Sequence, residues 1–389
     1  MSELTYLEKL LDGVKVEWQT LGKVLKRTKG TKITAGQMKA LHKDNAPLKI
    51  FAGGKTVAFV DFKDIPEKDI NREPSIIVKS RGIIEFEYYD KPFSHKNEMW
   101  SYHSNNDAIS IKYIYYFLKI NEGYFQKIGG KMQMPQIATP DTDKFEVPIP
   151  CPDNPEKSLA IQSEIVRILD KFTALTAELT AELNMRKKQY NHYRDQLLSF
   201  KEGEVEWKTL GTFADNFDSL RKPITSGLRE TGNIPYYGAS GIVDYVKDYI
   251  FDDDLLLISE DGANLIARNT PIAFSISGKT WVNNHAHVLK FKNYTEQKFV
   301  EYYLNNINLT PYISGAAQPK LNKKNLESIR IPNPSLKEKE RIVTILDKFD
   351  TLTNSITEGL PREIELRQKQ YEYYRDLLFS FPKPETVSN

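Results

Sequence analysis

The feature of this sequence that most restricts its fold is a helical pattern that occurs twice. Apolar residues recur at alternating steps of three and four over residues 161–200, and the same pattern returns over residues 342–381. Ile-Leu-Asp-Lys-Phe at 168–172 matches residues 345–349 without a change. Such spacing is typical of a helix that packs along a partner helix. We therefore predict two long, similar helices that pack antiparallel, as an internal repeat with a pseudo-two-fold axis.

A tandem repeat interrupts the alternation in the first helix. Its residues are Thr176, Ala177, Glu178 and Leu179, followed by Thr180, Ala181, Glu182 and Leu183. Four extra residues in such a pattern lengthen a helix by about 6 Å. The second helical region carries Glu-Gly-Leu-Pro at 358–361. Because glycine often ends a helix and proline often opens one, we predict a break there.

The beginning of the chain resembles the end of the first helix. Residues 6–11 and 16–18 echo residues 193–198 and 205–207, and Thr-Leu-Gly follows shortly after the tryptophan in both places. The chain therefore reads as two equivalent halves. We expect the N-terminal segment to lie beside the end of the second helix.

Two modules of mixed character accompany the helices. Short β-type runs bounded by turn formers predict strands at 75–79, 83–89, 254–259 and 272–277, and amphipathic segments predict helices at 108–121 and 296–306. The fold class is α+β, with two α/β modules separated by two long antiparallel helices. We place the domains at residues 1–152 (first module with a short N-terminal helix), 153–202 (first helical spacer), 203–334 (second module), 335–381 (second helical spacer) and 382–389 (tail).

Composition limits the classes of protein to be considered. A single cysteine, Cys151, excludes a disulfide framework and suits a reducing cytoplasm. No apolar run approaches the roughly 20 residues that cross a bilayer, and no export signal is evident, so we expect a soluble cytoplasmic protein without membrane contacts. The net charge is only +2, but residues 22–49 hold eight Lys and Arg against the single acid Asp44. This segment is either a polyanion-binding surface or a solvated basic face.

No motif in the sequence predicts a reaction centre. Gly-Lys-Thr at 54–56 and 278–280 lacks the earlier glycine of a phosphate-binding loop. His285 and His287 would share one face of a strand, but no nearby Cys or third His completes a metal site. The chain also has no Pro-Pro dipeptide, which excludes the Asn-Pro-Pro-aromatic motif of amino-group methyltransferases. We therefore predict no catalytic residues and no metal ligands.

What remains is a set of side chains suited to DNA. Asn and Gln can make two hydrogen bonds to adenine, Arg and Lys can address guanine, and Lys in loops often contacts phosphates. The candidates in the first module are Lys26, Arg27, Lys55, Lys79, Arg81, Trp100, Tyr102, His103, Lys131, Gln133 and Gln136. The candidates in the second module are Arg221, Lys222, Arg268, Lys279, Asn283, Asn284, His285, Gln318, Lys320, Lys323 and Lys324. For each of them an ordinary structural or solvated role stays open.

These residues give the chain a family resemblance. The tandem repeat with Arg-Lys-Lys-Gln-Tyr at 186–190 after it, and residues 360–367, resemble the specificity subunits of type I restriction-modification systems, in particular the IC group. Gly-Ala-Asn-Leu at 262–265 and the segment 281–287 resemble a recurring recognition-domain pattern, which adds Asn264 and Trp281 to the DNA-binding candidates. The first module matches this pattern only loosely.

The resemblance implies a non-catalytic subunit that reads a split, asymmetric sequence of double-stranded DNA with two target-recognition domains. It also implies that the helices set the gap between the half-sites and dock two modification subunits. Those subunits would methylate adenine N6 with S-adenosylmethionine, and restriction subunits that act as motor nucleases would add ATP and Mg²⁺, while this chain would bind no cofactor. The alternatives are a self-sufficient DNA-modifying enzyme with an unrecognised site, and a coiled-coil scaffold without a role on DNA.

Overall fold

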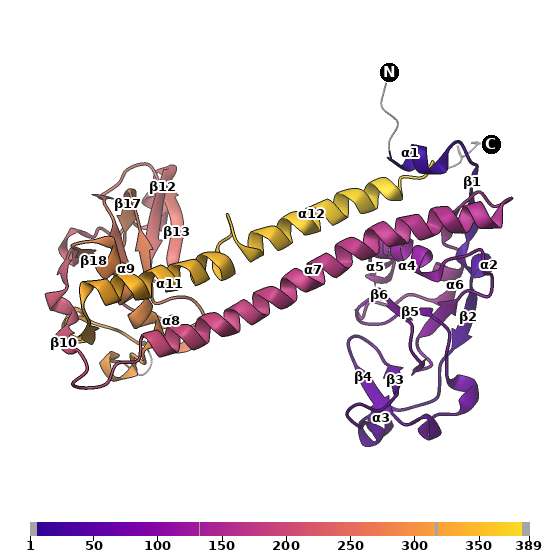
Figure 1. The fold of residues 1–389 in the computed structure, drawn as a ribbon, viewed down its shortest axis with the longest axis horizontal. Coiled ribbons are helices and arrows are strands. Elements are labelled where there is room, and N and C mark those ends of the chain that lie inside the picture. Colours follow the sequence, from indigo (N-terminus) through magenta and orange to yellow (C-terminus); the bar gives the residue numbers. More distant parts are fainter. Residues whose placement is uncertain (1–5, 132, 316–317, 383–389) are drawn as a thin grey trace. The chain divides into compact units, whose positions relative to one another are not determined.

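The computed structural model describes residues 6–131, 133–315 and 318–382. The chain divides into two compact units, Met1–Glu178 with Ile364–Asn389, and Leu179–Glu363. Each unit holds one module of helices and strands together with segments of both long helical regions (Figure 1). The α+β organisation with an internal repeat is therefore confirmed.

The elements follow the chain in two similar series. The first series is α1 (Tyr6–Leu11), β1 (Val16–Thr20), α2 (Leu21–Val24), β2 (Lys26–Lys29), α3 (Ala35–Leu41), β3 (Leu48–Phe51), β4 (Val57–Val60), η1 (Phe62–Asp64), η2 (Glu67–Asp69), β5 (Ser75–Lys79), β6 (Glu85–Tyr89), β7 (Phe93–His95), β8 (Trp100–His103), α4 (Ile111–Ile120), α5 (Glu122–Gly129), α6 (Thr139–Asp143), β9 (Glu146–Pro150) and α7 (Pro155–Leu197).

The second series is β10 (Glu206–Thr209), η3 (Leu210–Thr212), β11 (Ala214–Asn216), η4 (Asp218–Leu220), η5 (Ser226–Leu228), β12 (Thr231–Gly238), β13 (Gly241–Val246), β14 (Phe251–Asp252), β15 (Leu255–Ser259), α8 (Asn264–Ala267), β16 (Ala273–Ile276), β17 (Lys279–Val282), β18 (Ala286–Phe291), α9 (Tyr294–Asn306), η6 (Thr310–Tyr312), α10 (Lys323–Glu327), β19 (Arg330–Asn333), α11 (Leu336–Asn354) and α12 (Leu360–Leu378). The strands expected at 75–79, 83–89, 254–259 and 272–277 are β5, β6, β15 and β16.

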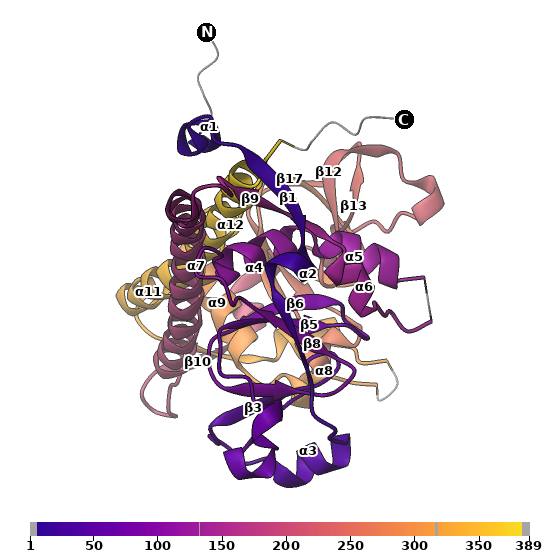
Figure 2. The same ribbon diagram turned by 90° about the vertical axis from the view of Figure 1, so that its right-hand side faces the viewer.

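Each module is built on a four-stranded antiparallel sheet. The strand order is β2-β8-β5-β6 in the first module and β11-β18-β15-β16 in the second. Val78 of β5 pairs with Trp100 of β8, and Ile258 of β15 pairs with His287 of β18, at corresponding positions. A second sheet completes each module, with order β4-β3-β7 in the first and β13-β12-β17-β14 in the second. Figure 2 shows β3 and α3 at the end of the first module away from α4 and α5.

A two-stranded sheet closes the base of each module in the same way. Trp18 of β1 lies opposite Pro148 of β9, and Trp207 of β10 lies opposite Pro332 of β19. The backbone amide that directly follows β1 or β10 makes an equivalent hydrogen bond in the two modules. Leu21 N donates to the carbonyl oxygen of residue 145 at 2.8 Å, and Leu210 N donates to that of residue 329 at 2.8 Å. The shared Trp-x-Thr-Leu-Gly sequence therefore corresponds to one shared closure.

The long helices follow the sequence prediction. Helix α7 runs without a break through the tandem repeat, because neither Thr nor Ala nor Glu interrupts the backbone ladder. In the second region α11 ends at Asn354 and α12 begins at Leu360, so the predicted break is confirmed. Gly359 has φ +82°, and a Cβ at that position would lie 2.3 Å from the carbonyl oxygen of Thr351. Only glycine fits there.

Equivalent aromatic pairs join the helices in the two units. Phe172 stacks on Tyr374 with ring centroids 5.4 Å apart, and Phe349 stacks on Tyr193 with centroids 5.6 Å apart. The interplanar angles are 25° and 28°. Phe172 corresponds to Phe349 in the repeat, and Tyr193 to Tyr374, so each unit contains the same contact with the roles of the helices exchanged. The order of the partners along the chain is that of antiparallel helices.

Each module is fixed to its helices by a tyrosine and an aspartate. Tyr116 of α4 donates to Asp170 of α7 at 2.5 Å, and Tyr302 of α9 donates to Asp347 of α11 at 2.6 Å. Burial, and then the hydrogen bond to Asp347, raise the pKa of the Tyr302 hydroxyl far above its usual range. Tyr294 adds a second hydrogen bond to Asp347 at 3.0 Å. The aspartate of the Ile-Leu-Asp-Lys-Phe repeat is therefore the residue on which α4 and α9 dock.

The N-terminal helix lies where the repeat predicted it. Leu7 and Leu11 belong to the same buried cluster as Leu378 and Phe379 at the end of α12. Tyr6 donates from its hydroxyl to Glu164 of α7 at 3.0 Å. The start of the chain thus completes the helical packing of the first unit.

Candidate nucleic-acid interface

Three loops of the second module meet at one end of its main sheet. Gly262 N, in the turn after β15, donates to Pro319 O at 3.1 Å, and Leu321 N donates to Glu260 O at 2.7 Å. Glu260 N in turn donates at 2.9 Å to the carbonyl oxygen of His285, in the turn before β18. We call residues 260–262, 283–285 and 318–321 the loop end of the second module.

The first module has the same arrangement. Gly82 N donates to Pro135 O at 2.9 Å, and Ile137 N donates to Ser80 O at 3.0 Å. Residues 80–82, 96–99 and 133–137 form the loop end of this module, and Ser80 Oγ joins the first two of these segments through a 2.5 Å hydrogen bond to Glu98 O. An isolated bridge pairs residue 81 with 136 in the first module and residue 261 with 320 in the second, at the same place in the two frameworks.

Several of the predicted DNA-binding residues gather on these loops. Those that are exposed at a loop end or on the segment next to it are Arg81, Lys131, Gln133, Gln136, Lys222, Asn284, His285, Gln318 and Lys320. Those that are exposed on other parts of the modules are Lys26, Arg27, Lys55, Lys279, Lys323 and Lys324. The exposed residues are therefore the ones that we carry forward as candidate contacts.

Other predicted residues of the first module are part of its interior. Lys79 is buried, bound to Glu85 and, at 2.8 Å, to Glu87. Trp100 and Tyr102 are also buried, and both hydrogen-bond to Thr142, at 3.1 and 2.8 Å. His103, at the end of β8, is half-buried. The sequence could not distinguish these positions, because alternation along a strand does not say which face meets the core.

Two predicted residues of the second module brace a turn. Arg268 has φ +53° and donates from its guanidinium to the carbonyl of Ile307 at 2.6 Å, with longer bonds to the carbonyls of Asn305 and Leu304 at the end of α9. Asn264 makes two 3.0 Å hydrogen bonds to the backbone of Thr270. These side chains shape the loop after β15.

Asn283 and Trp281 also hold the backbone. Asn283 is buried, and its Oδ1 accepts from His285 N at 2.8 Å, while Trp281 Nε1 donates to Lys222 O at 2.5 Å. The expectation that His285 and His287 share one face of a strand was wrong. His285 lies in the turn before β18 and is exposed, whereas His287 lies inside the strand and is buried.

A buried ionic network, not foreseen from the sequence, lies beneath the loop end of the second module. Arg221 Nη1 donates to Glu260 Oε2 at 2.6 Å, and His287 Nδ1 lies 2.6 Å from Asp218 Oδ2. Lys320 Nζ lies 3.2 Å from Glu260 Oε1. The other imidazole nitrogen, Nε2 of His287, lies 2.6 Å from the carbonyl oxygen of residue 321, so each ring nitrogen faces an acceptor.

Burial by itself would raise the pKa of both acids in this network. The hydrogen bond from His287 and its charge, followed by the amide of residue 288 and Arg221, instead hold the pKa of Asp218 below its usual value. Arg221, His287 and Lys320 do the same for the pKa of Glu260. Both acids are therefore favoured as carboxylates by the cations around them.

Three side chains of this network, Asp218, Glu260 and His287, are of the types that can bind a metal cation. Ligand atoms of Asp218, Glu260 and His287 lie within 4.8 Å of one another. The Arg221 guanidinium, however, lies against both carboxylates, 3.5 Å from Asp218 and 2.6 Å from Glu260. Because this guanidinium already supplies the compensating positive charge, we interpret the cluster as an internal ion-pair network.

The hairpin of β12 and β13 also reaches the loop end of the second module, which the sequence analysis missed. Asn283 N donates to Tyr237 O at 3.0 Å, and Ser259 Oγ donates to Ala239 O in the hairpin turn at 2.5 Å. The signal was present in the turn formers Gly-Ala-Ser-Gly at 238–241. Its position next to Asn283 depends on the parallel pairing of β12 with β17, which local sequence does not reveal.

In the ranges that the structure describes, no helix combines the length and the apolar character that a membrane span requires.

Comparison with known proteins agrees with this architecture. Residues 15–186 and 202–366 each match the family described as the type I restriction modification DNA specificity domain. The chain is 44% identical over 415 aligned residues to the type I restriction enzyme EcoR124I/EcoR124II specificity subunit of Escherichia coli, with 100% of both chains covered. It is 39% identical to the EcoprrI specificity subunit of Escherichia coli, with 92% of this chain and 93% of the relative covered.

A solved structure has the same fold. The crystal structure of a type I restriction-modification system S subunit from M. genitalium superposes with a TM-score of 0.66 at 18% identity, covering 96% of this chain and 98% of that one. Both the sequence matches and the repeated architecture extend over nearly the whole chain. The protein therefore belongs to the family of type I restriction-modification specificity subunits.

Proposed function

We propose that the two modules read the two halves of an interrupted, asymmetric DNA sequence, each through its loop end. The observation that carries this proposal is a difference at equivalent positions. Arg81 and Gln136 pair in the first module where Asp261 and Lys320 pair in the second. The backbone framework is the same, but the groups offered to a base edge are different. Two unlike half-sites are the expected consequence.

The exposed amides and cations of the loop ends are the proposed readers. Gln133, Gln136, Asn284 and Gln318 can each present a donor and an acceptor to adenine, and Arg81 can make two hydrogen bonds to guanine. The lysines at the loop ends and along β2 are better suited to phosphates, because an ammonium group on a flexible stem makes no planar, two-point contact.

The helices are the proposed docking surface for two identical modification subunits. The internal repeat presents equivalent faces twice, which lets one chain bind two copies of a partner. Methylation with S-adenosylmethionine would belong to those subunits, and the use of ATP and Mg²⁺ to restriction subunits that join them. This chain would supply the recognition of DNA within a complex that acts in the cytoplasm.

The proposal is tested with the complex reconstituted from this chain and its modification subunits. Methylation of a randomised DNA library should reveal one interrupted sequence, and exchange of residues 203–334 for the module of another family member should change only one half of it. A change in both halves would contradict the assignment of one module to each half-site. The purified chain alone, incubated with DNA and S-adenosylmethionine, should show no turnover; methylation in that sample would favour the self-sufficient enzyme.

Single substitutions separate readers from phosphate contacts. Arg81→Ala should lower the preference for guanine at one position of one half-site by roughly 1–3 kcal/mol. The matched control is Lys144→Ala, which removes an exposed cation just before β9, at the base of the same module. If Arg81→Ala instead weakens binding to every sequence equally and reduces the salt dependence, then Arg81 contacts a phosphate.

A further inference from the structure

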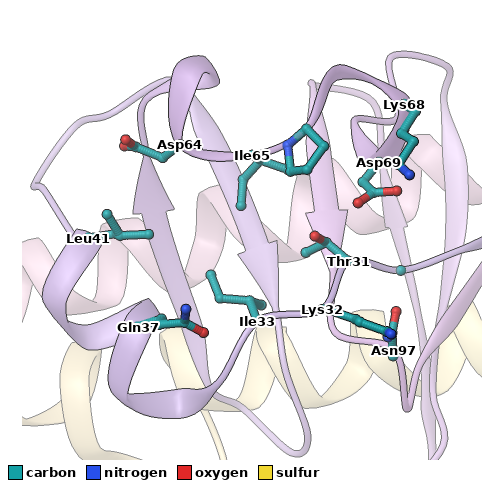
Figure 3. Close-up of a pocket in the computed structure, with 12 residues that line it drawn as sticks. Thr31, Lys32, Ile33, Gln37, Leu41, Asp64, Ile65, Lys68, Asp69 and Asn97 are labelled. Carbon is teal, nitrogen blue, oxygen red and sulfur yellow. The ribbon is translucent and has the colours of Figure 1, made fainter.

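The first module contains an open polar groove beside its loop end. The groove has a volume of about 490 Å³, and its polar lining includes Lys32, Gln37, Asp64, Lys68, Asp69 and Asn97. Ile33 and Ile65 lie between these side chains, so the polar groups surround an apolar floor (Figure 3). None of the lining residues was a DNA-binding candidate in the sequence, because they come from four separate segments between residues 30 and 97.

The groove belongs to the same end of the module as Arg81. Asn97 lies in the turn before β8, which corresponds to the turn with Asn284 and His285 in the second module. Residues 30–33 leave β2 and pass directly beside this turn, since Thr31 N donates to the carbonyl of residue 95 at 2.8 Å.

A glycine makes this close passage possible. A Cβ at Gly30 would lie 2.3 Å from the carbonyl oxygen of His95 and 2.5 Å from that of Lys96. No other residue fits between these two carbonyl groups without a shift of the backbone. Gly30 therefore fixes where Lys32 stands relative to Asn97 on the rim of the groove.

Four of the six polar side chains in the groove are not used by the fold, whereas Asp64 accepts from the amide of Asp61 at 3.2 Å. Within the part of the chain that the structure describes, the side chains of Lys32, Lys68, Asp69 and Asn97 have no hydrogen bond or ion pair. Gln37 uses its Oε1 to cap α3, at 2.9 Å from Thr34 N. Lys43, which does not line the groove, is by contrast bound to Asp61. The groove thus keeps both donors and acceptors available.

This mixture of groups points to one kind of ligand. A phosphate requires donors only, and the carboxylates of Asp64 and Asp69 would repel it. A base edge in the major groove presents both donors and acceptors: the cytosine amino group suits a carboxylate, adenine suits an asparagine, and a lysine can add a hydrogen bond to the acceptors of guanine. The exposed Lys26 and Lys29 of β2, on the approach to the groove, are placed to bind the adjoining phosphates.

We propose that this groove is a base-reading site of the first module, in which Asp69 and Asn97 select bases of its half-site and Lys32 and Lys68 assist them. The inference rests on the proposed function, and it adds specificity-determining residues that the loops 80–82 and 133–137 do not contain. The ligand is the exposed base edge of double-stranded DNA.

The test uses the complex of the full chain with its modification subunits, with binding to a randomised DNA library as the readout. Asn97→Ala and Asp69→Asn alter the groove from two separate turns, so a folding defect in one variant leaves the other informative. Asp44→Asn is the matched control for Asp69→Asn, because Asp44 belongs to the same module, lies outside the groove and has a side chain that is 95% exposed.

Each groove variant should change base preference at one or two positions of the first half-site by roughly 5- to 140-fold, the range expected for a good base contact. The second half-site and the control should be unchanged. An unaltered first half-site, or uniform weakening on all sequences, would overturn the groove assignment. If the wild-type complex itself shows no interrupted sequence preference, then the proposed function fails, and that outcome is distinct from the failure of the groove alone.

Discussion

Glu260 allows a sharp test of how the second module holds its loop end in place. The residue is only 9% exposed, and its carboxylate contacts Arg221 at 2.6 Å and Lys320 at 3.2 Å. Glu260→Gln keeps the shape of the side chain and removes its charge. In this variant the guanidinium of Arg221 keeps its contacts to the carbonyl of Ala286 at 2.7 Å and to Asp218 at 3.5 Å, so its positive charge is still compensated.

The expected cost is that of weakened hydrogen bonds to charged groups, about 2–3 kcal/mol. For a cooperative unit of this size each kcal/mol lowers the melting temperature by about 2–4 °C, so the second unit should melt about 4–12 °C lower. Differential scanning calorimetry measures this shift directly. Glu230→Gln is the matched control, because Glu230 pairs with Lys247 at 3.0 Å on the surface, with side chains 74% and 66% exposed, and its loss should barely change the melting temperature.

The pH dependence gives a second reading of the same interaction. The cations around Glu260 hold its pKa below the ordinary value of 4.5, so the unfolded chain binds a proton there more readily than the folded one. The stability that the carboxylate contributes is therefore fully present above about pH 4.5 and is lost as the pH falls through the lower, folded-state pKa. The difference between wild type and Glu260→Gln should close in that acidic range. A difference that stays constant down to pH 3, or no difference at neutral pH, would refute the network as a source of stability.

Three further predictions concern the framework. Tyr302→Phe removes the 2.6 Å hydrogen bond to Asp347 and should destabilise the second unit by about 1.5–3 kcal/mol in thermal denaturation, while Tyr245→Phe, at an exposed tyrosine, should not. Gly232→Ala should loosen the β12–β13 hairpin, because its Cβ would lie 2.4 Å from Lys247 Cα, whereas Gly227→Ala meets no atom within 4 Å; hydrogen exchange of the hairpin amides compares the two. One more Thr-Ala-Glu-Leu unit after residue 183 adds about 6 Å to α7, and at 3.4 Å per base pair it should lengthen the preferred gap by one to two base pairs without changing either half-site. Binding to targets with gaps varied one pair at a time checks this, and an unchanged gap would contradict the role of the helices as a ruler.

The sequence predicted the features that repeat locally. The helical periodicity predicted α7 and the equivalence of Phe172 with Phe349, because steps of three and four report directly on one helical face. The break at Gly359 was predicted from the glycine and the proline of residues 358–361. The strand β5 was predicted with its observed bounds, since residues 75–79 form a β-type run and the turn residues Arg81 and Gly82 follow closely.

The composition of the loop ends was less accessible from the sequence. Arg221 and Glu260 are 39 residues apart, and nothing in either local pattern indicates that they form an ion pair. Tyr102 was one of the predicted DNA-binding residues, but its ring is buried and its hydroxyl binds Asp143. The groove with Asn97 draws on four segments, so only the folded chain brings it together. Sequence periodicity reports on elements, whereas these sites depend on which elements become neighbours.

The reversal of charge between the loop ends explains how one framework can serve two half-sites. The turn amides make the same backbone hydrogen bond in both modules, from Gly82 to Pro135 and from Gly262 to Pro319. The side chains at the bridge can therefore change without altering the backbone that holds them. Under the proposed function, Arg81 offers donors that suit the acceptor edge of guanine, whereas Asp261, 2.9 Å from Nδ1 of His285, offers an acceptor. A scaffold without a role on DNA would gain nothing from the exchange of Arg81 for Asp261 at matched positions, whereas a protein that reads two unlike half-sites needs different groups there.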